Sequence, residues 1–147
     1  MGEPVAEKLS TRPAGLPGAL AQYVLVILAV GFGGAIGAIG RWKLAESISR
    51  HWRSDYPWAT FLINLSGCFV LGWYLGFVAR RGSGGPLTRL AITTGVLGAY
   101  TTFSAFAYES VRLIQHGRIA VGAVYVVASL VLGILSTAAG LRLSRGA

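Results

Sequence analysis

The residues best suited to binding an ion lie in one short run, Gly95 to Phe106, inside a long apolar segment. Two glycines, two adjacent threonines and a serine make a poor uninterrupted helix, because each glycine costs about 1 kcal/mol relative to alanine. In lipid, backbone groups freed by a helix break must face protein or a cavity, since lipid offers them no hydrogen bonds. Broken spans of this kind bind ions in membrane proteins. The run therefore predicts an ion-handling site.

Aromatic and polar side chains on this and the preceding apolar segment have spacings that place them on shared helix faces. Phe103 and Phe106 are three residues apart, so their electropositive ring edges could face an anion, although ordinary packing is also typical of such a pair. Thr60, Asn64 and Cys68 follow one another at four-residue intervals. The amide of Asn64 fits two interpretations, an interhelical hydrogen bond and a donor to a passing anion.

The third and fourth apolar segments add a carboxylate and two hydroxyls. Tyr125 and Ser129 are four residues apart and would form a polar track if they faced Asn64. Glu109 is the only carboxylate within an apolar segment, where a mid-bilayer charge costs at least about 2.5 kcal/mol. Because it lies close to Arg112, we expect an interfacial residue paired with that basic neighbour.

The elements that position these residues are membrane spans. The chain has 147 residues, of which 54% are apolar and 12% charged, against about 25% charged in soluble domains. Four apolar stretches each reach the roughly 20 residues that a helical span needs. We therefore predict an all-α membrane protein with four transmembrane helices, the third broken mid-membrane. The spans cover about Leu20–Gly40, Trp58–Ala79, Leu90–Ile114 and Ile119–Leu141, with residues 1–19 as a polar extension and 20–147 as the four-span domain.

The basic residues give the net charge of +8 and lie at span ends, which favours a membrane protein over a nucleic-acid binder. The two sides of a four-span chain carry nearly equal positive charge, so either orientation could insert, unless interfacial arginines hide a preference. Equal insertion predicts an antiparallel, dual-topology homodimer. The side with both termini has seven: Lys8, Arg12, Arg80, Arg81, Arg89, Arg142 and Arg145. The other has six: Arg41, Lys43, Arg50, Arg53, Arg112 and Arg118.

Glycines spaced four apart predict close helix–helix contacts. Gly33 and Gly37 form such a stripe on the first span, and Gly72 and Gly76 form another on the second. Arg41 continues the first stripe in phase. It would either extend to the lipid headgroups or lie in an aqueous vestibule and attract anions.

Taken together, these motifs resemble the Fluc (CrcB-type) fluoride channels over nearly the whole chain after Leu20. The sequence Thr-Thr-Phe-Ser-x-Phe, followed by Glu three residues later, is far more specific than a lone glycine pattern. The resemblance implies a dual-topology homodimer of four-helix subunits in the cell (inner) membrane, with two fluoride pathways and a structural sodium ion near its centre. The motifs are Gly33–Trp42, Ala59–Phe69, and Gly95–Phe106 with Glu109.

The same resemblance implies roles for individual residues. Backbone carbonyls of Gly98 and Thr101 would bind Na⁺, while Arg41 and Glu109 would be vestibule or structural charges. Cys68, where a serine is commoner, and the long N-terminal extension depart from the family pattern. The fluoride pathway would comprise Asn64, Thr102, Phe103, Ser104, Phe106, Tyr125 and Ser129.

Three functions therefore compete: a passive channel that exports fluoride and lowers its cytoplasmic concentration, a proton-coupled exporter, and a non-transporting scaffold. A small dual-topology exporter needs a carboxylate in its first span, and Tyr23–Gly40 has none. A scaffold would leave the broken third helix unexplained. We expect no catalysis, because the chain lacks a nucleotide-binding loop and a metal cluster, and His51 and His116 fall at span ends.

Overall fold

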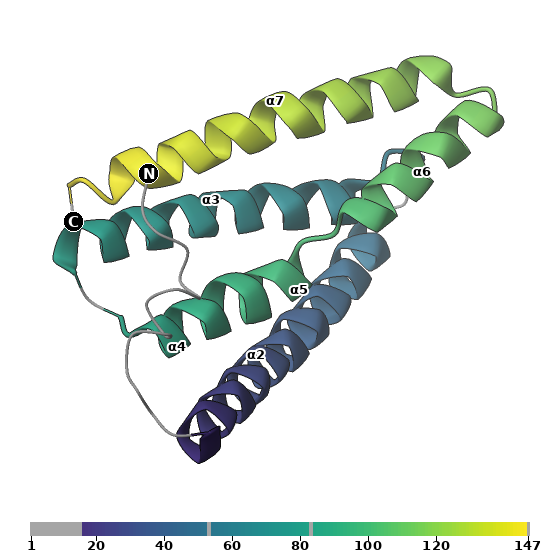
Figure 1. Ribbon diagram of the computed structural model, residues 1–147. Coiled ribbons are helices and arrows are strands. Elements are labelled where there is room, and N and C mark those ends of the chain that lie inside the picture. Colours follow the sequence, from purple (N-terminus) through teal and green to yellow (C-terminus); the bar gives the residue numbers. More distant parts are fainter. Residues whose placement is uncertain (1–15, 53, 83, 147) are drawn as a thin grey trace.

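Helices make up all of the regular structure in the computed structural model, which describes residues 16–52, 54–82 and 84–146 (Figure 1). No strand occurs among these residues. Four helical stretches are long and apolar enough to cross a membrane, which confirms the predicted all-helical, four-span protein. In chain order the elements are α2 (Leu16–His51), α3 (Trp58–Arg81), α4 (Pro86–Leu90), the π-helix η1 (Ala91–Leu97), α5 (Gly98–Tyr100), α6 (Phe103–Gln115) and α7 (Ile119–Leu143).

The second and fourth spans lie side by side, because small residues let their backbones approach closely. Figure 1 shows α3 and α7 running next to each other along most of their length. A side chain at Gly72 would collide with the backbone of Thr137, and one at Gly140 would collide with that of Phe69. Gly76 likewise lies against Ser144, so the predicted glycine pair on the second span is confirmed as a packing face.

The first span packs on the third in the same way. In Figure 1, α2 crosses against the segment that runs from α4 to α5. A Cβ atom at Gly33 would meet the Ala91 carbonyl, and one at Gly37 would meet the carbonyl of Val96. The stripe predicted from sequence is therefore a helix–helix contact, and the first half of the third span is held by backbone-to-backbone packing.

Helix α2 is longer at both ends than the apolar pattern predicted. It begins at Leu16, so the last four residues of the expected 1–19 extension are helical. Pro17 is tolerated there because amides in the first helical turn have no intrahelical acceptor to lose. Residues 1–15 of that extension lie outside the described residues.

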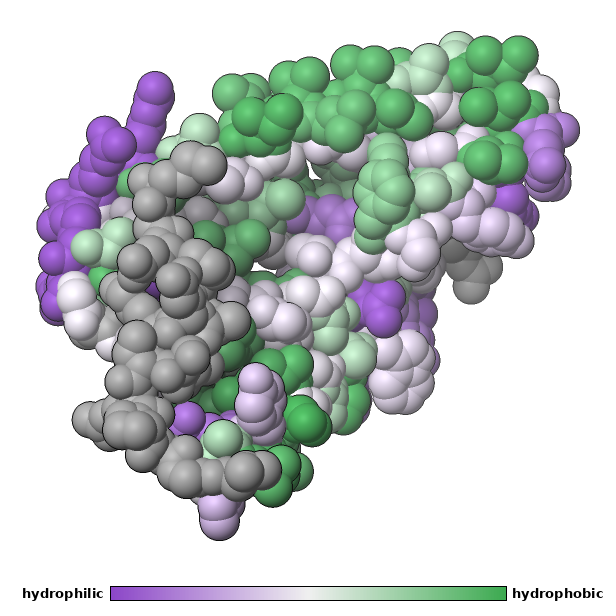
Figure 2. Space-filling view, in the orientation of Figure 1, coloured by the Kyte–Doolittle hydropathy of each residue, from purple (hydrophilic) through white to green (hydrophobic). Residues whose placement is uncertain are grey.

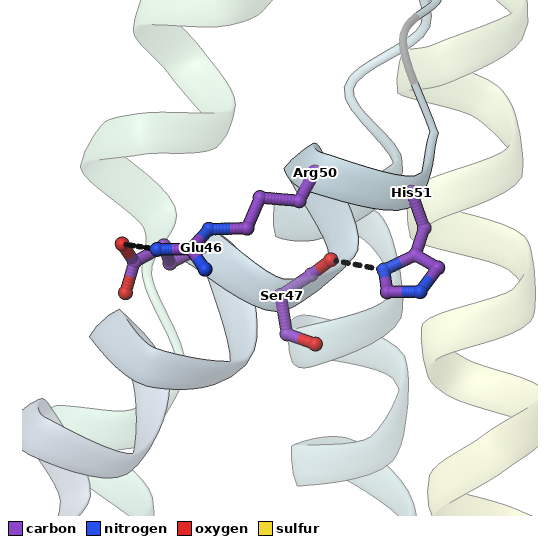
Figure 3. Close-up of polar contacts among 4 residues, drawn as sticks. All are labelled: Glu46, Ser47, Arg50 and His51. Carbon is purple, nitrogen blue, oxygen red and sulfur yellow. Dashed lines mark hydrogen bonds and ion pairs between the residues drawn. The ribbon is translucent and has the colours of Figure 1, made fainter.

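The C-terminal end of α2 carries polar contacts that continue the helix past Gly40 to His51. Arg50 donates to Glu46 across one turn at 2.6 Å (Figure 3), with the acidic residue N-terminal to the basic one, the order that stabilises helices. The Nδ1 of His51 lies 3.0 Å from the carbonyl oxygen of Ser47. These contacts support the last turns of α2, which polar residues occupy.

The third span changes geometry twice before α6 begins. Its residues Ala91–Leu97 are π-helical, which the sequence pattern did not predict. The backbone is then extended at Thr101 (φ −82°, ψ 156°) and Thr102 (φ −146°, ψ 114°). The Thr102 hydroxyl accepts a hydrogen bond from the Ala105 amide at 3.2 Å, as an N-cap residue does, and helix α6 starts at the next position.

The molecular surface is hydrophobic along the spans and hydrophilic at their ends (Figure 2). In Figure 2 the exposed side of α7 is broadly hydrophobic, and hydrophilic residues gather at the two ends of the molecule. At the end formed by the α2–α3 and α6–α7 connections, Trp58 packs against both Trp52 and Tyr56, with ring centroids 5.2 and 4.5 Å away. Tryptophan and tyrosine are typical of the membrane–water boundary.

Candidate functional site

A groove of about 300 Å³ lies beside the interruption of the third span. It is bounded by α3, by both halves of the third span and by α7, so three of the four spans contribute to it. Its wall combines hydroxyl, amide and aromatic groups with leucine side chains, which is the character of a weakly polar ion site rather than of a charged one. The residues that carry the hydroxyl, amide and aromatic groups are Asn64, Thr93, Thr101, Thr102, Phe103, Phe106 and Ser129, and Cys68 adds a thiol.

Asn64 holds the extended backbone of the break from the side. Its Nδ2 donates to the Thr102 carbonyl at 3.0 Å, and its Oδ1 accepts from the Thr102 amide at 2.8 Å. The side-chain amide thus satisfies both backbone groups of a residue that has left the helix. Of the two interpretations of Asn64, the structure shows the interhelical hydrogen bond. This bond uses one of the two N–H groups of the side-chain amide.

The break also diverts the amides that would complete the helix around Gly98 and Thr101. In a continuous helix, the Gly98 carbonyl would accept from Thr102 and the Thr101 carbonyl would accept from Ala105. Here the Thr102 amide donates to Asn64, and the Ala105 amide donates to the hydroxyl of Thr102. Both carbonyls therefore lose the amides that would hydrogen-bond to them in a helix. Carbonyl oxygens freed in this way are suitable ligands for a hard cation such as Na⁺.

The two phenylalanines that begin α6 both line the groove. Their ring centroids are 5.7 Å apart and their planes are tilted by 47°. Phe103 is 77% exposed, whereas Phe106 is half-buried and packs against Tyr125 with centroids 5.3 Å apart. Phe106 is thus held in place by its neighbours, while Phe103 lies open at the edge of the groove.

Hydroxyl groups predicted to line one fluoride pathway lie in different places. Ser129 lines the groove, and its Oγ is buried without a hydrogen-bond partner among the described residues. The Ser104 hydroxyl lies 3.2 Å from that of Thr102 at the start of α6. The Tyr125 hydroxyl instead donates to Glu109 at 2.8 Å, and its side chain is fully buried. Ser129 is therefore an unpaired donor at the groove, whereas the hydroxyl of Tyr125 is already used.

The prediction that Glu109 pairs with Arg112 is wrong. Glu109 accepts from Thr60 at 2.8 Å through Oε1 and from Tyr125 through Oε2. The Arg112 guanidinium lies over the Tyr108 ring, 5.9 Å from its centroid. The reason is the direction of α6 after the break, which turns Glu109 inward, where two hydroxyl donors can stabilise its carboxylate.

A second cavity, which we call the mouth cavity, opens between the α2–α3 and α6–α7 connections. Its volume is about 560 Å³, and it runs from the loop before α3 and the turn before α7 to Glu109. Asp55 and Arg118 form an ion pair across it at 2.5 Å. Burial raises the pKa of the Tyr56 phenol, so this group stays neutral at the rim. The remaining polar lining residues are Ser54, Arg112 and His116.

Arg41 lies on α2, outside the lining of both cavities. Its side chain is half-buried, and its Nε has no hydrogen-bond partner in the part of the chain that the structure describes. The structure therefore does not bring Arg41 to the groove.

Two residues of this region received no role from the sequence. Thr60 bonds to Glu109, and its signal was the four-residue spacing that places it on the same face of α3 as Asn64. Thr93 lines the groove from η1, and its hydroxyl donates to the Arg89 carbonyl at 2.8 Å. No spacing rule could indicate Thr93, because the π-helix changes which residues share a face.

Comparison with known proteins places the chain among membrane channels. Residues 28–141 match the family model described as CrcB-like protein, Camphor Resistance (CrcB). The chain is 41% identical over 121 residues to "Fluoride-specific ion channel FluC 1" of Moorella thermoacetica, covering 82% of this chain and 86% of that protein. It is 39% identical to "Fluoride-specific ion channel FluC" of Rhizobium meliloti over 81% of this chain and 95% of the relative. It is also 42% identical to "Fluoride-specific ion channel FluC 2" of Nitrobacter hamburgensis, over 84% and 97% of the two chains.

Proposed function

The chain belongs to the CrcB-like family, and we propose that it is a passive fluoride-selective channel that lowers cytoplasmic fluoride by letting it leave the cell. It is a multi-pass membrane protein of the cell (inner) membrane and an ion channel, not an enzyme. The observation that carries this proposal is the groove beside the break, where an amide-held backbone, two phenylalanines and an unpaired serine meet without a fixed positive charge.

The chemistry of the groove suits a small and strongly hydrated anion. Fluoride must exchange its water for donors, yet it must not meet a site so strong that it cannot leave. The ring edges of Phe103 and Phe106 carry only the weak positive potential of an aromatic quadrupole. The hydroxyl of Ser129 and the second N–H of Asn64 add neutral donors. The groove therefore supplies several weak sites in sequence.

A pathway through one subunit would join the groove to the mouth cavity. Phe106 lines the groove and packs on Tyr125, whose hydroxyl bonds to Glu109 at the inner end of the mouth cavity. In this proposal Tyr125 and Glu109 stand between the two spaces, and Thr102 and Ser104 present hydroxyls at the start of α6. Arg41 lines neither space and contributes only its charge, from α2. Fluoride would pass from neutral donors to a region that contains basic residues.

We also propose a structural Na⁺ ion at the break, held by the backbone carbonyls of Gly98 and Thr101. The diversion of their amide partners supports this assignment. When bound, the ion would supply a positive charge that satisfies carbonyls which lipid cannot satisfy.

The proposed assembly is an antiparallel homodimer surrounded by membrane lipid, with two such pathways. The near-equal positive charge on the two sides supports insertion in both orientations. An antiparallel pair would repeat the groove with inverted direction, as inverted repeats do in larger transporters.

An ion-flux measurement separates this function from its alternatives. Purified protein in liposomes loaded with fluoride or chloride should release fluoride rapidly, with chloride retained and with no dependence on a proton gradient. Flux that needs a proton gradient would favour the exporter, and flux of neither ion would favour a scaffold. Because α2 carries no carboxylate between Tyr23 and Gly40, we expect no proton coupling.

A further inference from the structure

The mouth cavity contains a charge balance that the proposed pathway does not explain. Asp55 lies in the loop before α3, Arg118 precedes α7, and their side chains meet at 2.5 Å. The same two residues line both cavities at this end of the molecule, one of about 560 Å³ and the other of about 520 Å³. The ion pair therefore lies where an anion would approach from water.

The other charged groups of the mouth cavity are engaged elsewhere. The Glu109 carboxylate accepts from two hydroxyls at the inner end of the cavity. Arg112 lies over the Tyr108 ring, and the Nδ1 of His116 lies 2.7 Å from the Arg112 carbonyl oxygen. Arg118 is thus the lining cation whose charge is offset by direct contact with a carboxylate.

We propose that Asp55 sets the electrostatic potential of the mouth by offsetting the charge of Arg118, and so limits how strongly the channel draws anions toward its pathway. Both side chains are at least half-exposed, so the pair contributes little to folding and acts mainly through its field. An unpaired arginine at this point would attract fluoride, but it would also attract every larger anion in the medium. The inference rests on the proposed channel function and deepens it.

Two neutral substitutions with opposite expected effects test the proposal. In fluoride-loaded liposomes at low ionic strength, Asp55→Asn should raise the initial efflux rate about threefold, and Arg118→Gln should lower it about threefold. The double variant should return to the wild-type rate. All differences in rate should shrink near 1 M salt, where the Debye length is about 3 Å. With a wild type that conducts fluoride, a loss of flux in both single variants would indicate a tether between the loops and would overturn the proposal, as would flux unchanged in both.

A second readout measures the local potential without any ion flux. Ser54 lines both cavities, so Ser54→Cys in a Cys68→Ser background places one thiol at the mouth. In detergent, its reaction with a sulfonate-bearing methanethiosulfonate, relative to a trimethylammonium-bearing one, should rise about tenfold with Asp55→Asn and fall with Arg118→Gln. An unchanged ratio would overturn the proposal.

The matched control removes a carboxylate from another solvent-exposed ion pair, which does not line the cavity. Glu46→Gln breaks the contact with Arg50 on α2 (Figure 3) and should leave the reagent ratio unchanged. A ratio that responds to Asp55→Asn and not to Glu46→Gln supports the proposal even if the wild-type protein carries no fluoride. A wild type that carries no fluoride would overturn only the proposed function.

Discussion

Replacing Asn64 with leucine removes both hydrogen bonds that hold the Thr102 backbone at the break. A buried backbone group left without a partner costs about 1–3 kcal/mol, which gives about 2–6 kcal/mol for the two. Interhelical hydrogen bonds in membranes average about 0.6 kcal/mol, which gives about 1.2 kcal/mol. Because Thr102 is half-buried and borders the groove, water reaches it on opening, and we expect a loss of about 1–3 kcal/mol in local stability.

Hydrogen exchange at the Thr102 amide measures this loss directly. About 1.4 kcal/mol corresponds to a tenfold change, so a loss of about 1–3 kcal/mol should make exchange of this amide at least about fivefold faster in Asn64→Leu than in the wild type. Ser66→Ala is the matched control, because Ser66 lies on the same helix and bonds to Ile63 and Tyr100 instead. Exchange within about twofold of wild type in Asn64→Leu would refute the reasoning that the amide holds the break.

Three further predictions concern the groove, the helix contacts and the proposed cation. Phe103→Ile and Phe106→Ile should each lower fluoride efflux about tenfold with an unchanged size-exclusion profile, and wild-type flux in both would exclude the ring-edge role. Gly37→Ala should cost about 1–3 kcal/mol because its Cβ would meet the Val96 carbonyl, and Gly34→Ala, which has open space, should not; thermal denaturation in detergent compares them. Replacing sodium by a large organic cation should lower the denaturation temperature, with recovery on adding Na⁺ back, and an unchanged temperature would argue against a sodium ion at the break.

The spans and their packing faces were predictable because they depend on local composition and on a fixed helical period. Apolar length located all four spans, and four-residue spacing identified Gly33 and Gly37 as a contact face. The same period placed Asn64 on the face of α3 that meets the break. These features repeat along a regular helix, so sequence alone contains the information.

The directions of side chains beyond an irregular segment were not predictable. The π-helix Ala91–Leu97 and the extended Thr101 and Thr102 change the direction in which the side chains of α6 point. Glu109 therefore faces Thr60 and Tyr125 instead of pairing with Arg112. Sequence spacing gives neighbours within one helix, but it does not give the rotation between two helices joined by a break.

The most direct test of the central claim is the reversal potential of the purified protein in a planar bilayer, with a tenfold fluoride gradient and equal chloride on both sides. A fluoride-selective pore through the groove predicts a current that reverses about 59 mV from zero, at the fluoride equilibrium potential. Reversal near zero, or the absence of current with protein incorporated, would contradict a selective fluoride pathway.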